Sequence, residues 1–297
     1  MSNEPAVIPA DEPLVLTSTF SRRTGFRRPK WLTLPVMAGL GVLIFWLVVA
    51  ITVPLWSPHD PQAVVGDRLR GPTLSQPLGT DNLGRDVLSR TLYGGRTAMP
   101  VAIVVILGAL LVGCTIGGIS GFFGGWVDAV VMRIVDLTLA FPALLLAMTV
   151  TAYLGRDIKN IVIGIVAVSW PGYARLLRGQ VLAIRKFEHV EAATALGASR
   201  TRVLLRHVLP LAISPIIVAA TMDFGGVILL IASLSFIGLG AKPPSPEWGV
   251  MITDGSRYFY QWWVAAGPGL AIFSVVLGAN FVGDGLRDVL DPRTRDH

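Results

Sequence analysis

The sequence predicts an all-α integral membrane protein with six transmembrane helices. Of its 297 residues, 53% are apolar and only 15% are charged, whereas about a quarter of the residues in an average soluble domain are charged. The apolar residues form long runs without Asp, Glu, Lys or Arg and do not alternate at the spacing of an amphipathic element. A helix that crosses a bilayer core of about 30 Å needs about 20 such residues. These observations exclude a water-soluble globular fold.

Six apolar runs approach or exceed the length of a membrane span. They cover residues 31–57, 97–127, 137–155, 160–174, 208–241 and 258–283. The fourth run is short, but it continues through apolar residues to Ile184. Arg175 and Arg178 lie near the end of this extended run, where their long side chains can reach the membrane interface.

The distribution of basic residues predicts that both termini are cytoplasmic. In that orientation 16 of the 25 Lys and Arg residues lie on the cytoplasmic side, in agreement with the positive-inside rule. We therefore expect cytoplasmic tails at residues 1–30 and 291–297, a first transmembrane helix at 31–57, an extracytoplasmic segment at 58–96 and a five-helix core at 97–290. The formal charge of +6 then reflects membrane topology and does not indicate a nucleic-acid partner.

Short patterns predict local contacts between and within the helices. Small residues recur every four positions in the second run, at Gly113, Gly117, Gly121 and Gly125, and such a stripe allows a second helix to approach closely. Asp128 follows a Gly-rich turn and is suited to cap the next helix. On that helix, Arg133 and Asp136 are spaced for an intrahelical pair. In the extracytoplasmic segment, Asp81, Arg85 and Asp86 are expected to pair locally.

The segment 185–210 predicts two short helices on the cytoplasmic side. Residues 191–196 are rich in helix formers, Gly197 is a natural C-terminal stop, and Ser199 can cap a second helix. That second helix carries Arg200, Arg202 and Arg206. A short helix with Ala side chains can enter the groove of a partner protein, but the residues alone give equal weight to a docking helix and to an amphipathic loop at the membrane interface.

Within this segment, Glu191-Ala192-Ala193, followed by Gly197 and then Leu209-Pro210, resembles the EAA motif of ABC-importer permease subunits. Further stretches are similar to the C-type permease of dipeptide, oligopeptide and nickel importers: residues 78–90, 169–175, 234–240, 243–249 and 283–288. One position departs from the family pattern, because His207 stands where that family commonly has Ile. We therefore expect no coupling role for His207.

The resemblance implies that the 185–210 loop contains a coupling helix that docks on an ATP-binding subunit. The coupling residues that it implies are Glu188, Glu191, Ala192, Ala193, Ala195, Leu196, Gly197, Ala198 and Arg202. It also implies a homologous B-type permease as second subunit, two ATP-binding subunits that hold ATP and Mg²⁺, and an extracytoplasmic substrate-binding protein. The complex would lie in the inner membrane of a prokaryote and import dipeptides or oligopeptides.

The sequence bears independently on where ATP would be bound. A P-loop requires Gly-Lys-Ser/Thr, and none of the four Lys residues follows a Gly. No paired acids, metal-ligand spacing or nucleophile pattern predicts a catalytic or metal site. We therefore expect a non-catalytic subunit without a cofactor of its own.

Asp223 is the one charged residue well inside an expected span. A carboxylate at the bilayer centre costs about 2.5–3.5 kcal/mol on insertion scales. Three roles remain open: a polar position on the translocation pathway, a partner of a neighbouring helix, or a position near the membrane edge. The alternative function is an ion-coupled secondary transporter that uses Asp223 as a relay, but no His or Lys chain accompanies it.

Overall fold

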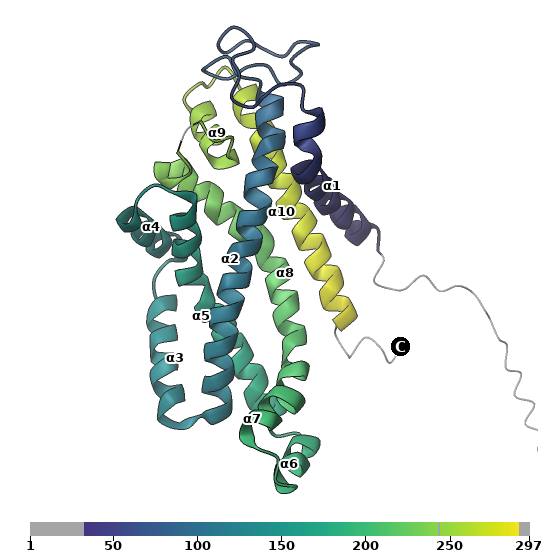
Figure 1. Cartoon of the computed structure of the whole chain (residues 1–297), viewed down its shortest axis with the longest axis vertical. Coiled ribbons are helices and arrows are strands. Elements are labelled where there is room, and N and C mark those ends of the chain that lie inside the picture. Colours follow the sequence, from purple (N-terminus) through teal and green to yellow (C-terminus); the bar gives the residue numbers. More distant parts are fainter. Residues whose placement is uncertain (1–32, 243, 291–297) are drawn as a thin grey trace, which may run out of the picture. The chain divides into compact units, whose positions relative to one another are not determined.

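The computed structural model describes residues 33–242 and 244–290, and this part of the chain is helical without extended strands. Five helices in it are long and apolar enough to cross a membrane. They are α1 (Leu34–Trp56), α2 (Val87–Phe123), α5 (Ile158–Ile184), the helical stretch Arg200–Leu239 that contains α8 (Leu209–Leu234), and α10 (Trp263–Leu290). Figure 1 shows these helices packed as a bundle. The predicted all-α membrane fold is confirmed, whereas the expected tails at 1–30 and 291–297 lie outside the described residues.

The third expected span is not one straight helix. The chain forms α3 (Gly125–Leu139) and α4 (Ala143–Leu154), which meet at an angle of 91°. Pro142 lies at the break and precedes α4. Proline lacks an N–H group and disfavours the helical conformation of the residue before it, which favours a break between α3 and α4 at this position. The described chain therefore has six spans if this bent pair crosses as one, and five otherwise.

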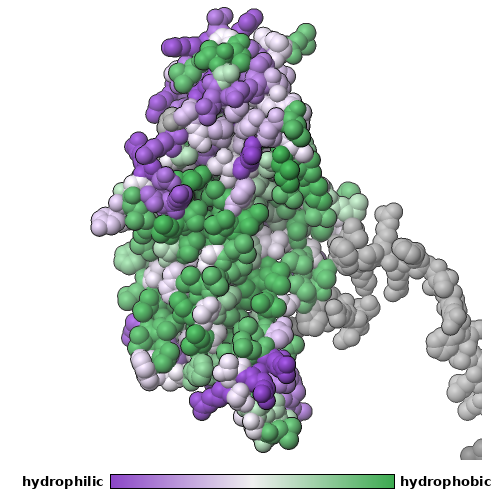
Figure 2. Space-filling view, in the orientation of Figure 1, coloured by the Kyte–Doolittle hydropathy of each residue, from purple (hydrophilic) through white to green (hydrophobic). Residues whose placement is uncertain are grey.

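The surface agrees with a location in the bilayer. Figure 2 shows a broad belt of hydrophobic residues across the middle of the visible face and hydrophilic residues towards both ends. Large apolar side chains such as Leu107, Leu111 and Ile217 are exposed in this part of the bundle. Contiguous apolar surface of this kind is typical of a membrane or protein contact and not of a water-facing surface.

Glycines allow α2 and α5 to pack backbone against backbone. A Cβ atom at Gly113 would lie 2.5 Å from the Trp170 carbonyl oxygen, and one at Gly117 would lie 2.7 Å from the Ala174 Cα atom. A Cβ atom at Gly121 would lie 3.0 Å from the carbonyl oxygen of Arg178. The predicted close approach is therefore confirmed for three of the four glycines. Gly125 instead begins α3 with a positive φ of 64°.

The main hydrophobic core contains two tryptophans with satisfied indole N–H groups. Trp46 of α1 and Trp248 of α9 (Trp248–Ser256) pack edge to face with ring centroids 4.9 Å apart. The Trp46 Nε1 donates to Ser274 Oγ at 2.9 Å, and the Trp248 Nε1 donates to the Thr91 carbonyl oxygen at 2.8 Å. These contacts connect α1, α2, α9 and α10 at one end of the bundle.

Ion pairs connect α3 to α5 and correct two expectations. Asp128 does not cap α3, because Gly124 is the N-cap residue. Its carboxylate instead accepts from Arg178 Nε at 2.5 Å and from Nη2 at 2.6 Å. Asp136 pairs with Arg175 of α5 and not with Arg133. Both expectations considered only neighbours in sequence, whereas α5 brings two arginines against the acidic face of α3.

Candidate functional site

α6 (Glu188–Ala195) projects from the end of the bundle opposite to α9 (Figure 1). Val190 is only 3% exposed and anchors this short helix in a hydrophobic cluster. Glu188, Ala192 and Ala195 are spaced four and three residues apart, so they share the face opposite Val190, and all three are exposed. Leu196, directly after α6, is 89% exposed. The helix therefore presents a small, partly apolar face to its surroundings.

The ends of α6 follow from local sequence. Glu188 and Glu191 lie in its first turn, where negative charge is favourable to the helix dipole. Gly197 has a positive φ of 84°, and the Ala198 N–H donates to the Ala193 carbonyl oxygen at 3.1 Å. This reversal at a C-terminal glycine is a common helix stop, and the expected end of the helix at Gly197 is confirmed.

The remaining predicted coupling residues lie close to α6. Ala193 and Ala198 are half-buried, whereas Arg202 is exposed on α7 (Arg200–Val203). Ser199 precedes α7 as expected, but in the described structure its side chain makes no capping hydrogen bond. The structure therefore brings the predicted residues together in one projection, in which all of them except Ala193 and Ala198 are exposed.

Packed side chains connect this projection to the long helices. The cluster that holds Val190 continues through residues of α5, α7, the turn that follows α7, and α8, namely Tyr173, Leu177, Val181, Ile184, Val203, Leu204, Val208 and Ala212. The Arg185 Nη1 also donates to the Gly121 carbonyl oxygen of α2 at 3.3 Å. Val190 thus connects α6 to a packed cluster that reaches α5 and α8.

A π-helical turn at Leu204–Val208 joins α7 to α8, and sequence reasoning missed it. Pro210 lies two residues after this turn and has no N–H to donate into it. Such wide turns are frequent at functional positions in helices. Leu209-Pro210 was identified as part of a motif in the sequence, but the π-helical turn before it was not predicted. His207 lies within this turn.

Asp223 lies near the middle of α8 and lines a cavity of about 360 Å³. α2, α5 and α8 supply most of the wall, which is largely apolar. The side chains of Ser169 and Tyr173 on α5 line the same cavity. The proximity of Tyr173 to Asp223 could not be predicted, because it depends on how α5 and α8 pack.

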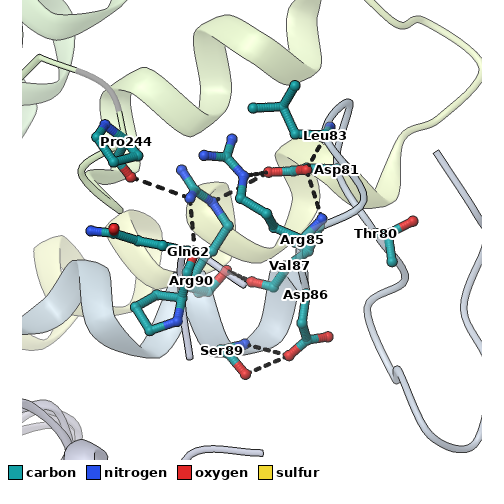
Figure 3. Close-up of polar contacts among 12 residues, drawn as sticks. Gln62, Thr80, Asp81, Leu83, Arg85, Asp86, Val87, Ser89, Arg90 and Pro244 are labelled. Carbon is teal, nitrogen blue, oxygen red and sulfur yellow. Dashed lines mark hydrogen bonds and ion pairs between the residues drawn. The ribbon is translucent and has the colours of Figure 1, made fainter. Parts of the chain in front are cut away.

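The opposite end of the bundle contains a buried ion network, shown in Figure 3. The Asp81 carboxylate accepts from Arg85 Nε at 2.7 Å and lies 3.4 Å from Arg90 Nε. The Arg90 side chain is 2% exposed, and its Nη1 donates to the carbonyl oxygens of Pro61 at 3.0 Å and Pro244 at 3.4 Å. The expected Asp81–Arg85 pair is confirmed, and Arg90 extends it to the loop before α9. This network fixes the segment before α2 in a defined conformation.

Glu247 is a second buried acid at this end. It is 2% exposed, and its carboxyl oxygens accept from the backbone N–H groups of Gly249 at 3.0 Å and Val250 at 3.1 Å, which caps α9. Burial raises the pKa of Glu247, although these hydrogen bonds oppose the shift. The folded protein therefore binds a proton more tightly here than the unfolded chain does.

We expect a Glu247→Gln variant to keep the cap and to gain stability relative to the wild type as pH rises. An acid with a raised pKa in the folded state contributes its stability below the unfolded pKa, about 4.3 for Glu, and loses it as pH rises through the folded value. Thermal unfolding of both proteins in detergent between pH 4 and pH 8 measures this difference. Glu247→Ala is the control: it also lacks the titrating group, and it should be about 1 kcal/mol less stable than Glu247→Gln at every pH through loss of the cap. A Gln-to-wild-type difference that does not vary with pH would contradict the prediction.

The described chain is an α-helical membrane bundle from which one short helix projects, and comparison with known proteins identifies its family. Residues 113–296 match the family described as binding-protein-dependent transport system inner membrane component, and the chain belongs to this family. It is a transport permease of the C type and not a member of an enzyme family. The resemblance found in the EAA-like segment is thereby confirmed at the level of the family.

Individual relatives cover most of the chain. This chain is 40% identical over 298 residues to the dipeptide transport system permease protein DppC of Alkalihalophilus pseudofirmus. The aligned region covers 99% of this chain and 97% of the relative. The chain is 42% identical over 254 residues to the probable D,D-dipeptide transport system permease protein DdpC of Escherichia coli K12, over 85% of each chain. It is 41% identical over 263 residues to the glutathione transport system permease protein GsiD of Pectobacterium atrosepticum, over 88% of this chain and 87% of the relative.

Proposed function

We propose that this chain forms half of the translocation pathway of an ATP-driven importer of dipeptides or short oligopeptides, with a homologous B-type permease as the other half. Its relatives are named for dipeptides, D,D-dipeptides and glutathione, which are all small peptides. The observation that carries the proposal is the exposed face of α6. A partner protein is needed to cover this face, and the chain lacks a P-loop of its own.

The charge distribution supports the proposed orientation. Basic residues gather at the end of the bundle that carries α6, including Arg185, Lys186, Arg200, Arg202 and Arg206. By the positive-inside rule this end faces the cytoplasm of a prokaryotic cell. The end with the buried Asp81 network then faces outward, where a substrate-binding protein would deliver the peptide. Both chain termini would be cytoplasmic.

In the proposed mechanism, α6 transmits movement from the ATP-binding subunits to the membrane helices. Two such subunits would hold ATP and Mg²⁺, and each would seat the coupling helix of one permease. Val190 belongs to the same packed cluster as Tyr173, which lines the cavity around Asp223. A shift of α6 would therefore reach the walls of that cavity through contiguous side chains. ATP-driven closure would open the path outward, and hydrolysis would reset it.

Uptake into proteoliposomes tests this proposal. The full complex of both permeases and both ATPase subunits is reconstituted with the binding protein and a labelled dipeptide, without an ion gradient. We expect uptake to require ATP on the side of α6 and to persist in the presence of a protonophore. A matched complex with a hydrolysis-deficient ATPase subunit should show no uptake. Uptake that follows a proton gradient and ignores ATP would overturn the proposal in favour of a secondary transporter.

A further inference from the structure

The cavity around Asp223 holds a negative charge without a cationic partner in the described chain. Asp223 is exposed on α8, and none of the ion pairs formed between described residues includes it. An unpaired carboxylate at this depth requires water or a cation from another molecule. The remaining wall is largely apolar, so little else in the cavity compensates this charge.

Tyr173 supplies a second, independent observation. Its side chain is 4% exposed, its buried hydroxyl oxygen makes no hydrogen bond of normal geometry among the described residues, and the Asp223 carboxylate lies close enough to interact with it. Tyr173 lines the same cavity, and Asp223 is its acidic neighbour. A phenol hydroxyl can donate one hydrogen bond and accept another. It can therefore orient the carboxylate and accept from a bound cation.

We infer that Asp223 and Tyr173 form a site on the translocation pathway that binds the protonated amino terminus of the passing peptide. This inference rests on the proposed function. An ammonium group carries three N–H donors, and the cavity offers acceptors on the Asp223 carboxylate, the Tyr173 hydroxyl and the Ser169 hydroxyl. A divalent metal is a poorer match, because the described residues contain no group of three or more metal-ligating side chains of the kind that would hold one. The single charge suits transient binding during transport.

A cysteine reporter tests both the charge and the ligand. Gly226 lies about one helical turn from Asp223, lines the same cavity, and has open space where a Cβ atom would be. A Gly226→Cys variant is made in a Cys114→Ser background, because Cys114 is the only native cysteine of this chain. The assembled complex in nanodiscs is then treated with cationic and anionic methanethiosulfonates.

We expect the cationic reagent to react about tenfold faster than the anionic one, and Asp223→Asn to abolish this preference. A nearby unit charge in partly hydrated protein is strong enough for a factor of this size. A dipeptide delivered by the binding protein should protect the introduced thiol from both reagents. An N-acetylated dipeptide, added at a concentration that saturates the binding protein, should protect the thiol at least fivefold less. Tyr173→Phe should weaken protection by the dipeptide but keep the reagent preference. Gly269→Cys on α10, where a Cβ atom would also have open space, is the control and should not respond to Asp223→Asn.

Three results would overturn the inference. The first is a reagent preference that Asp223→Asn leaves unchanged. The second is equal protection by the free and the acetylated dipeptide. The third is loss of the second permease from the Asp223→Asn complex, because the carboxylate would then serve a contact between subunits. A wild-type complex that keeps the charge preference but shows no ATP-dependent peptide uptake would contradict the proposed function and not the cation site.

Discussion

An Ala192→Trp variant is expected to fold normally and to lose at least nine-tenths of the ATP hydrolysis that loaded binding protein stimulates in the complex. Ala192 lies on the exposed face of α6, opposite the anchoring Val190. A surface substitution of this kind usually changes the free energy of unfolding by less than about 0.5 kcal/mol. If α6 is the contact surface, an indole group at position 192 would clash with the ATP-binding subunit, and a steric clash of this kind strongly weakens binding. ATPase assays and co-purification of the ATPase subunits measure the effect.

Ala192→Ser is the matched control for this variant. The hydroxyl group adds little volume, so we expect binding and stimulated ATP hydrolysis within about twofold of the wild type. Gly197 is a less selective position to test, because its positive φ of 84° strains every substitution. Retention of full assembly and stimulated hydrolysis by Ala192→Trp, with an unchanged melting temperature, would show that the exposed face of α6 is not the contact surface.

The sequence predicted the features of this protein that depend on local patterns. Gly197 predicted the end of α6, because glycine commonly terminates a helix. The four-residue spacing of glycines in α2 predicted that a second helix, α5 in the structure, approaches it closely. Long apolar runs predicted the membrane helices, because every backbone group in a bilayer must be satisfied within a helix or a closed barrel. The Asp81–Arg85 pair was predictable from its four-residue spacing.

The missed features depend on contacts between distant segments. Asp128 was expected to cap α3, but Arg178 lies 50 residues away and offers a bidentate charged contact that is stronger than a cap. The same limitation applies to Arg90 with Pro244 and to Tyr173 with Asp223. The residue pattern within one helix does not predict which face of another helix will pack against it. The end of α6 was therefore predictable from the sequence, whereas the composition of the cavity was not.

Among Gly→Ala substitutions in the bundle, the most damaging is expected at Gly117. A Cβ atom there would overlap the Ala174 carbonyl oxygen and lie 2.7 Å from the Ala174 Cα atom. Both are backbone atoms of α5, so no side chain can move aside to make room. Separating the helices would also disturb the packing at Gly113 and Gly121 on the same face. We expect Gly117→Ala to destabilise the protein by about 3 kcal/mol, towards the upper end of overpacking effects.

The neighbouring Gly118 provides a control within the same helix. A Cβ atom at Gly118 would lie 3.5 Å from Leu177 Cδ2, which is an ordinary van der Waals contact. Gly118→Ala should therefore be neutral, or stabilising by up to about 1 kcal/mol through the higher helix propensity of Ala. Thermal unfolding monitored by fluorescence size-exclusion chromatography compares the two variants in the same detergent. Equal melting temperatures would mean that α2 and α5 do not pack backbone to backbone at this position. A large loss for Gly117→Ala alone would confirm that α2 and α5 pack backbone against backbone at this position.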